Sequence, residues 1–307
     1  MSTATPTPIH SSDASLANAG SRYNLDETER TFLKARTGIQ TDEELKQHIL
    51  AVQREALTVH PYPCIVIFSF TKLNLGGLPA YGRLLELGKT RKDAIWLDVG
   101  CCFGNDVRKA VDDGYPIQNI IATDINPEFW VLGHKLFAST PETFPVPFVP
   151  GDAFDPAFLA PAPIATAASA PTGPAPPLSA LTTLTPLHGR VSAVSVCNVF
   201  HLFAAEEEQA RLARALAPLL SAEPGSMLLG KQAAQRESGV NTQGGAAGQE
   251  VTMFFHNAES WTALWDGGVF AKGTVEVEAQ LVEPPVWHQA EKSRAVYCVM
   301  EWSVTRV

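Results

Sequence analysis

The chain has little positive charge. Its 307 residues include 23 Lys and Arg against 32 Asp and Glu, which gives a formal net charge of −9, and no dense run of basic residues occurs. Nucleic acids and anionic membrane surfaces attract basic patches. The composition therefore argues against nucleic acid as a partner.

Long apolar runs are also lacking, although 45% of the residues are hydrophobic. No stretch approaches the ~20 apolar residues that a membrane-spanning helix needs, so we expect no membrane span. Residues 1–22 are rich in Ser, Thr, Ala and Pro, without the basic start and apolar core of a signal peptide. We expect a disordered tail there.

Cysteines are few and irregularly placed. The five stand at positions 64, 101, 102, 197 and 298, and no pair has the spacing of zinc ligands, so we predict no metal site. Adjacent cysteines such as Cys101 and Cys102 seldom pair with each other. The pattern favours a reducing, cytoplasmic compartment.

The most informative segment is a strand, a glycine turn and a helix. The apolar run Ile95–Val99 predicts a buried parallel strand, and Gly100 and Gly104 bracket a tight turn after it. An amphipathic helix then begins near Asn105. Such a corner, with a helix N-terminus at the carboxyl end of a strand, is typical of nucleotide binding.

The details of this corner argue against a dinucleotide. The dehydrogenase fingerprint needs glycine at three positions, which Gly100, Cys102 and Asn105 occupy here. A diphosphate would therefore meet side chains where it needs bare backbone. No Lys-Ser or Lys-Thr pair follows the turn, which excludes a phosphate-loop NTPase.

Acidic residues around the corner point to S-adenosylmethionine, which carries a sulfonium and an ammonium group and no phosphate. Asp98 stands just before the turn and suits such cations through charge-assisted hydrogen bonds. Asp124 ends the next predicted strand, 20 residues after Gly104, where a carboxylate accepts hydrogen bonds from ribose hydroxyls. Its alternative role is that of an acid at a helix N-terminus. We expect Ile125 to pack on the adenine face.

The segment Asp98–Gly104, with Arg108-Lys109 and Asp113-Gly114 after it, resembles the first motif of a group of fungal class I methyltransferases. Members act in secondary metabolism, notably as carboxyl O-methyltransferases on meroterpenoid intermediates. The likeness covers roughly residues 25 to 305. Its further segments are Thr37–Ile39, His60–Ile65, Leu78–Tyr81, Phe129-Trp130, Gly151-Asp152, His201–Phe203 and Gly225–Gln232.

The resemblance implies an α/β, Rossmann-like fold of the class I methyltransferase type. We expect a seven-stranded, mostly parallel sheet in the order 3-2-1-4-5-7-6, with an antiparallel last strand. Residues 23–93 form a helical N-terminal extension or lid, and residues 94–307 form the cofactor-binding domain. Within that domain, residues 160–187 form a low-complexity loop insertion, either a tolerated surface segment or an active-site flap.

The elements that we expect after the corner alternate along the chain. The short strand at 146–149 contains Pro147, which places it at a sheet edge. The remaining predictions are strands at 120–124, 191–199, 226–229, 274–282 and 295–305, and helices at 127–138, 206–220 and after the cap at Asn257.

Several further residues are candidates for the site. Asp152 would accept the adenine amino hydrogen, with Asp155 as its competitor, and the N–H of Ala153 would meet a ring nitrogen. Asn198 ends a strand and is either a cofactor or substrate contact or a turn residue. His201 is the candidate catalytic residue, as an orienting group or a base, and a packing role is the alternative.

Three more side chains have open roles at this stage. Tyr62 and Tyr81 either close over the sulfonium by cation–π attraction or pack in the core. Lys231 either attracts a substrate carboxylate or is simply solvated. We reject Cys101 and Cys102 as nucleophiles, because methyl transfer from a sulfonium needs none.

The sequence thus predicts an S-adenosylmethionine-dependent methyltransferase that acts on an oxygen, with a carboxylate as the expected acceptor, of a small-molecule polyketide or terpenoid. The alternatives are a cofactor-binding but inactive regulatory protein and an NAD-dependent oxidoreductase. A homodimer is a further possibility that the sequence leaves open.

Overall fold

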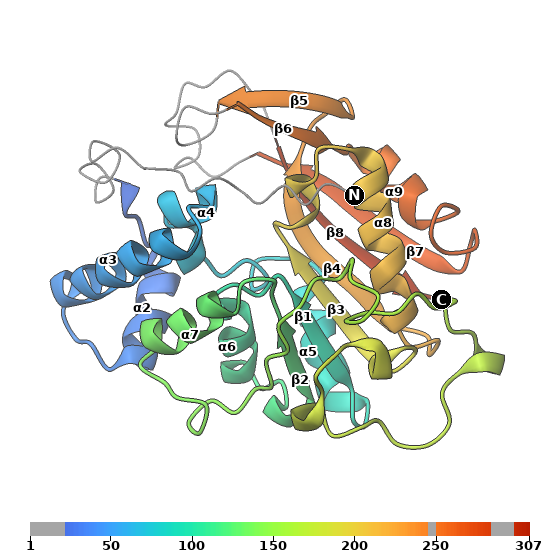
Figure 1. Cartoon of the computed structure of the whole chain (residues 1–307), viewed down its shortest axis with the longest axis horizontal. Coiled ribbons are helices and arrows are strands. Elements are labelled where there is room, and N and C mark those ends of the chain that lie inside the picture. Colours follow the sequence, from blue (N-terminus) through green and yellow to red (C-terminus); the bar gives the residue numbers. More distant parts are fainter. Residues whose placement is uncertain (1–21, 245–249, 284–297) are drawn as a thin grey trace.

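The computed structural model describes residues 22–244, 250–283 and 298–307 (Figure 1). All of the predicted tail but its last residue lies outside these ranges. A mixed sheet forms the centre of the molecule, and in the described chain it has six strands in the order β2-β1-β3-β4-β8-β7. Their bounds are β1 Ile95–Val99, β2 Ile120–Thr123, β3 Val191–Cys197, β4 Met227–Ala234, β7 Val275–Val282 and β8 Cys298–Arg306.

The strand directions agree with the predicted class I methyltransferase fold. The strands β2, β1, β3 and β4 are parallel, and β8 runs antiparallel to both of its neighbours, β4 and β7. The parallel strands are apolar and buried, as expected for strands covered on both faces. Their carboxyl ends therefore meet at one edge, where ligands bind in sheets of this kind.

One predicted strand is reduced to a single bridge. Residues 146–149 form one parallel bridge with β2, between Ala122 and Phe148, and the Thr123 hydroxyl also donates to the Val149 carbonyl at 2.7 Å. The N–H of Ala122 donates to the carbonyl of Pro147, and Val149 donates back to Ala122. Proline has no N–H to continue a ladder, so Pro145 and Pro147 confine this segment to the edge position that the sequence predicts.

Helices cover both faces of the sheet (Figure 1). On one face, α5 (Tyr81–Thr90) and α6 (Asn105–Asp112) pack on side chains such as Trp96 and Leu229. On the other face, α8 (Glu206–Leu216) and α9 (Ala258–Trp265) pack on side chains such as Val194 and Trp302. The helix predicted at 206–220 changes at Leu216 to a 3₁₀ turn, Ala217–Leu219, because Pro218 cannot continue the α-helical bonds.

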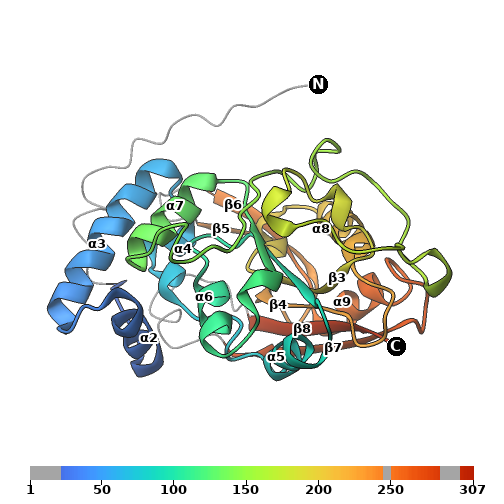
Figure 2. The same cartoon turned by 90° about the horizontal axis from the view of Figure 1, so that it is seen from below.

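The N-terminal extension is helical, as expected. It comprises α2 (Glu27–Thr37), α3 (Asp42–Val59), α4 (Pro63–Val66) and the 3₁₀ turn η2 (Ser69–Thr71). Figure 2 shows these helices gathered at one end of the molecule beside α7 (Pro127–Leu136). Apolar side chains of α2, α3 and α7 form one core cluster with Phe103 of the glycine turn. The extension is thus packed directly against the predicted cofactor corner.

Two segments after the corner have structure that the pattern did not predict. The strands β5 (Gly239–Gly244) and β6 (Glu250–Phe255) form a separate hairpin near the end of β4. The low-complexity loop contains three short 3₁₀ turns, Ala167–Ser169, Leu178–Ala180 and Thr185–Leu187. Its role as a flap or a surface insertion stays a prediction.

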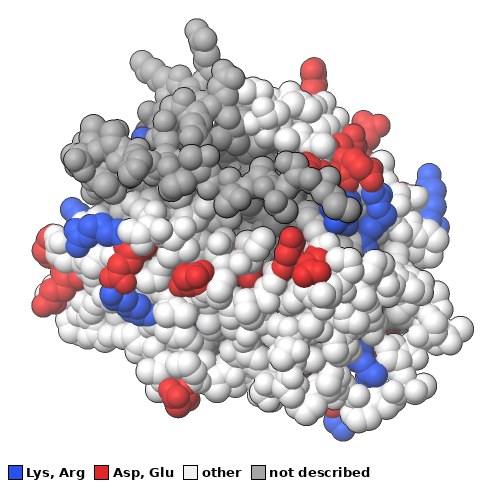
Figure 3. Space-filling model, in the orientation of Figure 1, with Lys and Arg blue, Asp and Glu red and all other residues white. Residues whose placement is uncertain are grey.

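The surface carries both signs of charge. Figure 3 shows Lys and Arg side chains interspersed with Asp and Glu on one face, with much of the described surface uncharged. Among the residues that the structure describes, no helix is both long and apolar enough to cross a membrane.

Candidate functional site

The turn between β1 and α6 is built from left-handed backbone. Gly100, Cys102 and Gly104 have φ of 69°, 50° and 69°. A Cβ on Gly100 would lie 2.4 Å from Cγ2 of Val199, and one on Gly104 would lie 2.5 Å from the Trp130 ring. Both glycines are thus required by conformation and by space. Cys102 adopts the same conformation with a side chain, which is uncommon for such a residue.

Asp98 lies in β1 just before this turn, as predicted, and its side chain is buried. Its Oδ1 accepts a hydrogen bond of 2.5 Å from the Ser195 hydroxyl, which in turn accepts one of 2.8 Å from Nε1 of Trp96. Burial, and after it the Asp106 carboxylate, raise the pKa of Asp98 to about 8. A cationic partner would therefore strongly stabilise the ionised form of this carboxyl group.

Asp106 is a site residue that the sequence analysis missed. It lies in the first turn of α6, is buried, and accepts the N–H of Leu75 at 2.9 Å. Burial raises its pKa to about 6, against the hydrogen bond from Leu75 and the attraction of the Lys231 ammonium. An acidic residue in the first turn of a helix usually serves only to stabilise the helix dipole, so the sequence pattern did not identify Asp106 as a candidate site residue.

Asp124 joins the end of β2 to the glycine turn. Its Oδ2 accepts the N–H of Cys102 at 2.9 Å and its Oδ1 accepts the N–H of Asn126 at 2.9 Å. The carboxyl group is buried enough that its pKa is raised in spite of these bonds. The neighbouring Ile125 is 59% exposed, an unusual exposure for a large apolar side chain beside a buried strand.

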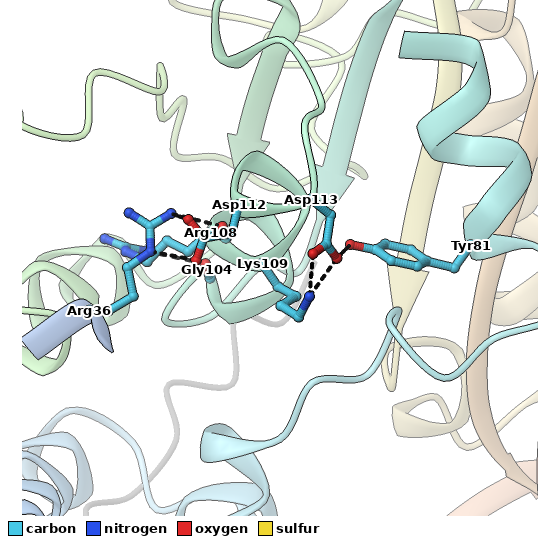
Figure 4. A network of polar contacts seen from close by, with 7 residues as sticks. All are labelled: Arg36, Tyr81, Gly104, Arg108, Lys109, Asp112 and Asp113. Atoms are coloured by element: carbon cyan, nitrogen blue, oxygen red, sulfur yellow. Dashed lines mark hydrogen bonds and ion pairs between the residues drawn. The ribbon is translucent and has the colours of Figure 1, made fainter. Parts of the chain in front are cut away.

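The N-terminal extension reaches this end of the site through Tyr62. The Tyr62 hydroxyl accepts a hydrogen bond of 3.2 Å from Nδ2 of Asn126, next to Asp124 in the chain. Tyr81 lies elsewhere, since its hydroxyl donates to Asp113 at 2.6 Å near the far end of α6 (Figure 4). The suggestion that Tyr81 closes over a sulfonium is therefore wrong, and its side chain belongs to the core.

Asp152 and Ala153 lie beside Asp124, because the N–H of Gly151 donates to the Asp124 carbonyl at 3.2 Å. The Asp152 side chain is exposed and accepts the N–H of Phe154 at 2.8 Å. Its competitor Asp155 closes a similar local turn on Ala157. The geometry thus brings Asp152 to the predicted edge, and its role toward adenine stays a prediction.

Asn198 lies at the end of β3 with a φ of 59°. Its N–H donates to the Lys231 carbonyl at 2.7 Å, and its Nδ2 donates to Oδ1 of Asn74 at 3.4 Å. Asn74 also hydrogen-bonds Asp106. The extension, the glycine-turn helix and the ends of β3 and β4 therefore meet around Asn74, a residue that no motif in the sequence singled out.

Lys231 and His201 stand on β4 and just after β3. Lys231 pairs with Cys197 in the register of β3 and β4, and its ammonium attracts the Asp106 carboxylate. His201 lies in the 3₁₀ turn η7 (Phe200–Leu202), and its Nδ1 accepts the N–H of Ala233 at a long 3.4 Å.

The thiols of the turn are unsuited to nucleophilic chemistry. Burial raises the pKa of both Cys101 and Cys102 well above the usual range. Across the described ranges, no group of three or more His, Cys, Asp or Glu side chains is arranged to hold a metal ion.

The donors and acceptors of this corner fit S-adenosylmethionine. The carboxyl groups of Asp98, Asp106 and Asp124 lie near enough to one another for Asp106 and Asp124 to raise the pKa of Asp98. A sulfonium or an ammonium would relieve this repulsion, and a diphosphate would increase it. A Cβ on Gly100 or Gly104 would collide with Val199 or Trp130, so the two glycines let the turn pack closely against these side chains.

The first comparison concerns the N-terminal extension. Residues 21–71 match the family model described as "Meroterpenoid methyltransferase N-terminal domain".

Named relatives are similar over longer stretches. O-methyltransferase atr3 of Stereocaulon alpinum is 38% identical over 42% of this chain, and the match spans 36% of that relative's length. Methyltransferase adrK of Penicillium roqueforti is 29% identical over 79% of this chain and 76% of its own. O-methyltransferase phiE of a fungal species is 29% identical over 76% of this chain and 68% of its own.

Among solved structures, an S-adenosylmethionine-dependent methyltransferase of Methanosarcina mazei is similar with a TM-score of 0.46. It is 12% identical, over 72% of this chain and 97% of that chain.

Proposed function

The chain belongs to the fungal family of meroterpenoid-pathway, S-adenosylmethionine-dependent methyltransferases, and from that premise we propose that it methylates a carboxylate oxygen of a small polyketide or terpenoid. The observation that supports the cofactor most directly is the group of three carboxyl groups around the turn, Asp98, Asp106 and Asp124. When bound, S-adenosylmethionine supplies an electrophilic methyl group on a positively charged sulfur.

Each part of the corner has a separate task in this proposal. Asp124 accepts hydrogen bonds from the ribose hydroxyls, and the exposed side chain of Ile125 covers the adenine, which Asp152 and Ala153 meet at its edge. Asp98 and Asp106 face the cationic end, where ionised carboxylates stabilise an ammonium or a sulfonium. The N–H groups of Gly100, Cys102 and Gly104 are bonded within the protein, to Thr123, Asp124 and Cys101, so the turn contributes its backbone shape to the site.

The acceptor side lies around Asn74, Asn198 and Lys231. Lys231 is half-buried, and its ammonium interacts electrostatically with the Asp106 carboxylate. A substrate carboxylate here would gain a charge-assisted contact. Because a carboxylate is already ionised, the reaction needs no general base, and holding acceptor and methyl in line supplies most of the rate gain.

His201 fits an orienting role better than that of a base. Its Nδ1 accepts the N–H of Ala233, which in the neutral imidazole leaves the proton on Nε2. An Nε2–H group donates to an acceptor oxygen and cannot remove a proton from it. We therefore propose that His201 and Asn198 orient the acceptor.

Calorimetric titration and a turnover assay test this function. We expect the protein to bind S-adenosylhomocysteine and not NAD, and to transfer labelled methyl groups from S-adenosylmethionine to members of a panel of aromatic and terpenoid carboxylic acids. Methyl esters of the same acids serve as matched controls. A preference for NAD would overturn the proposal, and so would cofactor binding with no methylated product from any carboxylic acid of the panel.

We further propose a reducing cytoplasmic location, since all five cysteines are free and Cys101 and Cys298 are buried as thiols. Thiol labelling of unfolded protein taken directly from cells should find five free thiols. The homodimer also stays a prediction, and light scattering coupled to size-exclusion chromatography measures it.

A further inference from the structure

Arg108, in the first half of α6, is a charged side chain with no acidic partner in the described chain. It is 1% exposed, and its guanidinium lies 4.4 Å from the ring centre of Phe144, 4.6 Å from that of Phe137 and 5.3 Å from that of Trp130. Burial lowers its pKa to about 9. Removing a guanidinium from water is costly, so the bonds that it makes in this aromatic cage need an explanation.

Those bonds go mainly to the glycine turn. Nη1 of Arg108 donates to the carbonyl of Phe103 at 2.8 Å and to that of Gly104 at 3.2 Å, and Figure 4 shows the side chain directed at Gly104. In a trans peptide the C=O and the following N–H point in opposite directions. Holding the Gly104 carbonyl therefore directs the N–H of Asn105 away from Arg108.

The turn that these bonds hold is strained at Cys102. With a φ of 50°, Cys102 is a non-glycine residue in left-handed backbone, a conformation that persists only when its surroundings enforce it. In this conformation its N–H donates to Asp124, the predicted ribose-binding acid. Relaxation of the turn would remove that bond and release the carboxylate.

We propose that Arg108 is a positioning residue that holds the Cys102–Gly104 turn in its left-handed form and thereby keeps Asp124 in place for the nucleoside cofactor. It acts through the backbone and touches no ligand. The inference rests on the proposed cofactor, so the wild-type protein must first be shown to bind S-adenosylhomocysteine.

The test is a titration of S-adenosylhomocysteine into the wild type, Arg108→Met and Arg108→Lys. We expect the Kd of Arg108→Met to rise by about tenfold to a hundredfold, the loss typical of hydrogen bonds from a charged group. The Kd of Arg108→Lys should lie between those of the wild type and Arg108→Met, because an ammonium replaces the forked donors of the guanidinium incompletely. Ser139→Ala is the matched control, since it removes the 3.4 Å contact from Nη2 and leaves the turn bonds intact.

A second measurement separates positioning from simple stability. Cys102→Gly removes the strain of the left-handed residue and keeps its N–H. In the Arg108→Met background it should restore part of the lost affinity, and the Kd of Cys102→Gly alone, measured alongside, is the reference for that rescue. Melting temperatures of the unliganded variants show which proteins remain folded.

The results distinguish the two proposals. If the wild type does not bind S-adenosylhomocysteine, the proposed function fails. If the wild type binds and both folded Arg108 variants bind equally well, or if Cys102→Gly gives no rescue, then Arg108 is only a buried structural cation and the inference is overturned.

Discussion

The backbone N–H of Cys102 donates to Oδ2 of Asp124 at 2.9 Å, and this bond ties the turn after β1 to the end of β2. The same carboxylate accepts the N–H of Asn126 through its other oxygen. Both oxygens are thus oriented by the backbone before any ligand binds. Such preorganisation lowers the ordering cost of recognition, because the carboxylate need not be fixed on binding.

Asp124→Asn should weaken cofactor binding with little loss of fold. The amide keeps the shape and can still accept the Cys102 N–H, but it loses the charge and one acceptor. We expect the Kd for S-adenosylhomocysteine to rise by about tenfold to a hundredfold, and Asp124→Ala to abolish binding. Asp155→Asn, an exposed acid in a local turn, is the control and should bind as the wild type does. Unchanged affinity in Asp124→Asn would remove Asp124 from the site.

Gly100→Ala should destabilise the protein. The left-handed conformation and the contact with Val199 together predict a loss of about 1–3 kcal/mol in the free energy of unfolding. Gly114 has a φ of 100°, and a Cβ at this position would meet open space. Gly114→Ala therefore measures the conformational part of the stability loss alone. Chemical denaturation measures both, and adding Val199→Ala to Gly100→Ala should recover the steric part. Equal losses at Gly100 and Gly114 would show that the Val199 contact is unimportant.

Cofactor affinity should rise with pH between about 6 and 8, the folded-state pKa values of Asp106 and Asp98. Both values exceed the unfolded value of 3.8, so the protonated acids stabilise the unliganded fold at low pH, and this contribution is lost as pH rises through 6 to 8. A cationic ligand favours the ionised acids and releases protons when it binds.

Titration of S-adenosylmethionine in two buffers of different ionisation enthalpy measures that proton release. Asp98→Asn should remove the part of the pH dependence nearest pH 8. An affinity that is flat from pH 6 to 8 would contradict the assignment of these acids to the cationic end.

Lys231→Met should impair catalysis with a carboxylic acid acceptor and leave S-adenosylhomocysteine binding unchanged. We expect kcat/KM for the acceptor to fall by about tenfold or more, since one charge-assisted contact is lost. Lys231→Arg keeps the charge and should retain most of the activity. Equal activity of the Met and Arg variants would show that Lys231 does not recognise the carboxylate.

His201→Ala should lower kcat/KM by about tenfold, the value of a hydrogen bond to a charged oxygen, while His201→Gln, which retains a donor, should lose less. With a carboxylic acid acceptor, which is already ionised, we expect the pH profile of kcat/KM to have the same shape in the wild type and in His201→Gln. An acid limb that is present in the wild type and absent in His201→Gln would show instead that His201 acts as a base.

The strands of the sheet were predicted well because each is a local pattern, whereas their order was expected from the family resemblance. The run Ile95–Val99 and the alternation of the last two strands are readable within a few residues, and the observed order agrees with the expected one. The exception is residues 146–149, which contain Pro147. How far such a segment pairs depends on the hydrogen bonds that the neighbouring strand β2 can make with it. The β5–β6 hairpin was missed because β5 begins and ends in glycine and has Val240 as its one apolar side chain, so it shows no apolar alternation.

The site was predicted unevenly for the same reason. Asp98, Gly100, Gly104 and Asp124 follow directly from the strand and turn motif. Asn74 and Asp106 were missed and Lys231 was left open, since they gain a shared role only where the N-terminal extension, α6 and β4 meet. For Tyr81 the sequence left a cation–π contact and core packing open, because its hydroxyl partner, Asp113, lies 32 residues away in the chain.

By itself, the sequence determined the glycine turn and the acids that flank it, because backbone conformation and strand ends depend on neighbouring residues. Only the tertiary structure showed that Arg108 donates to the carbonyls of Phe103 and Gly104 in this turn, and that Tyr62 of the extension contacts Asn126, next to Asp124. Contacts of that kind depend on how elements that are distant in the chain pack together. The burial that lowers the pKa of Arg108 and raises that of Asp98 likewise exists only in the folded chain.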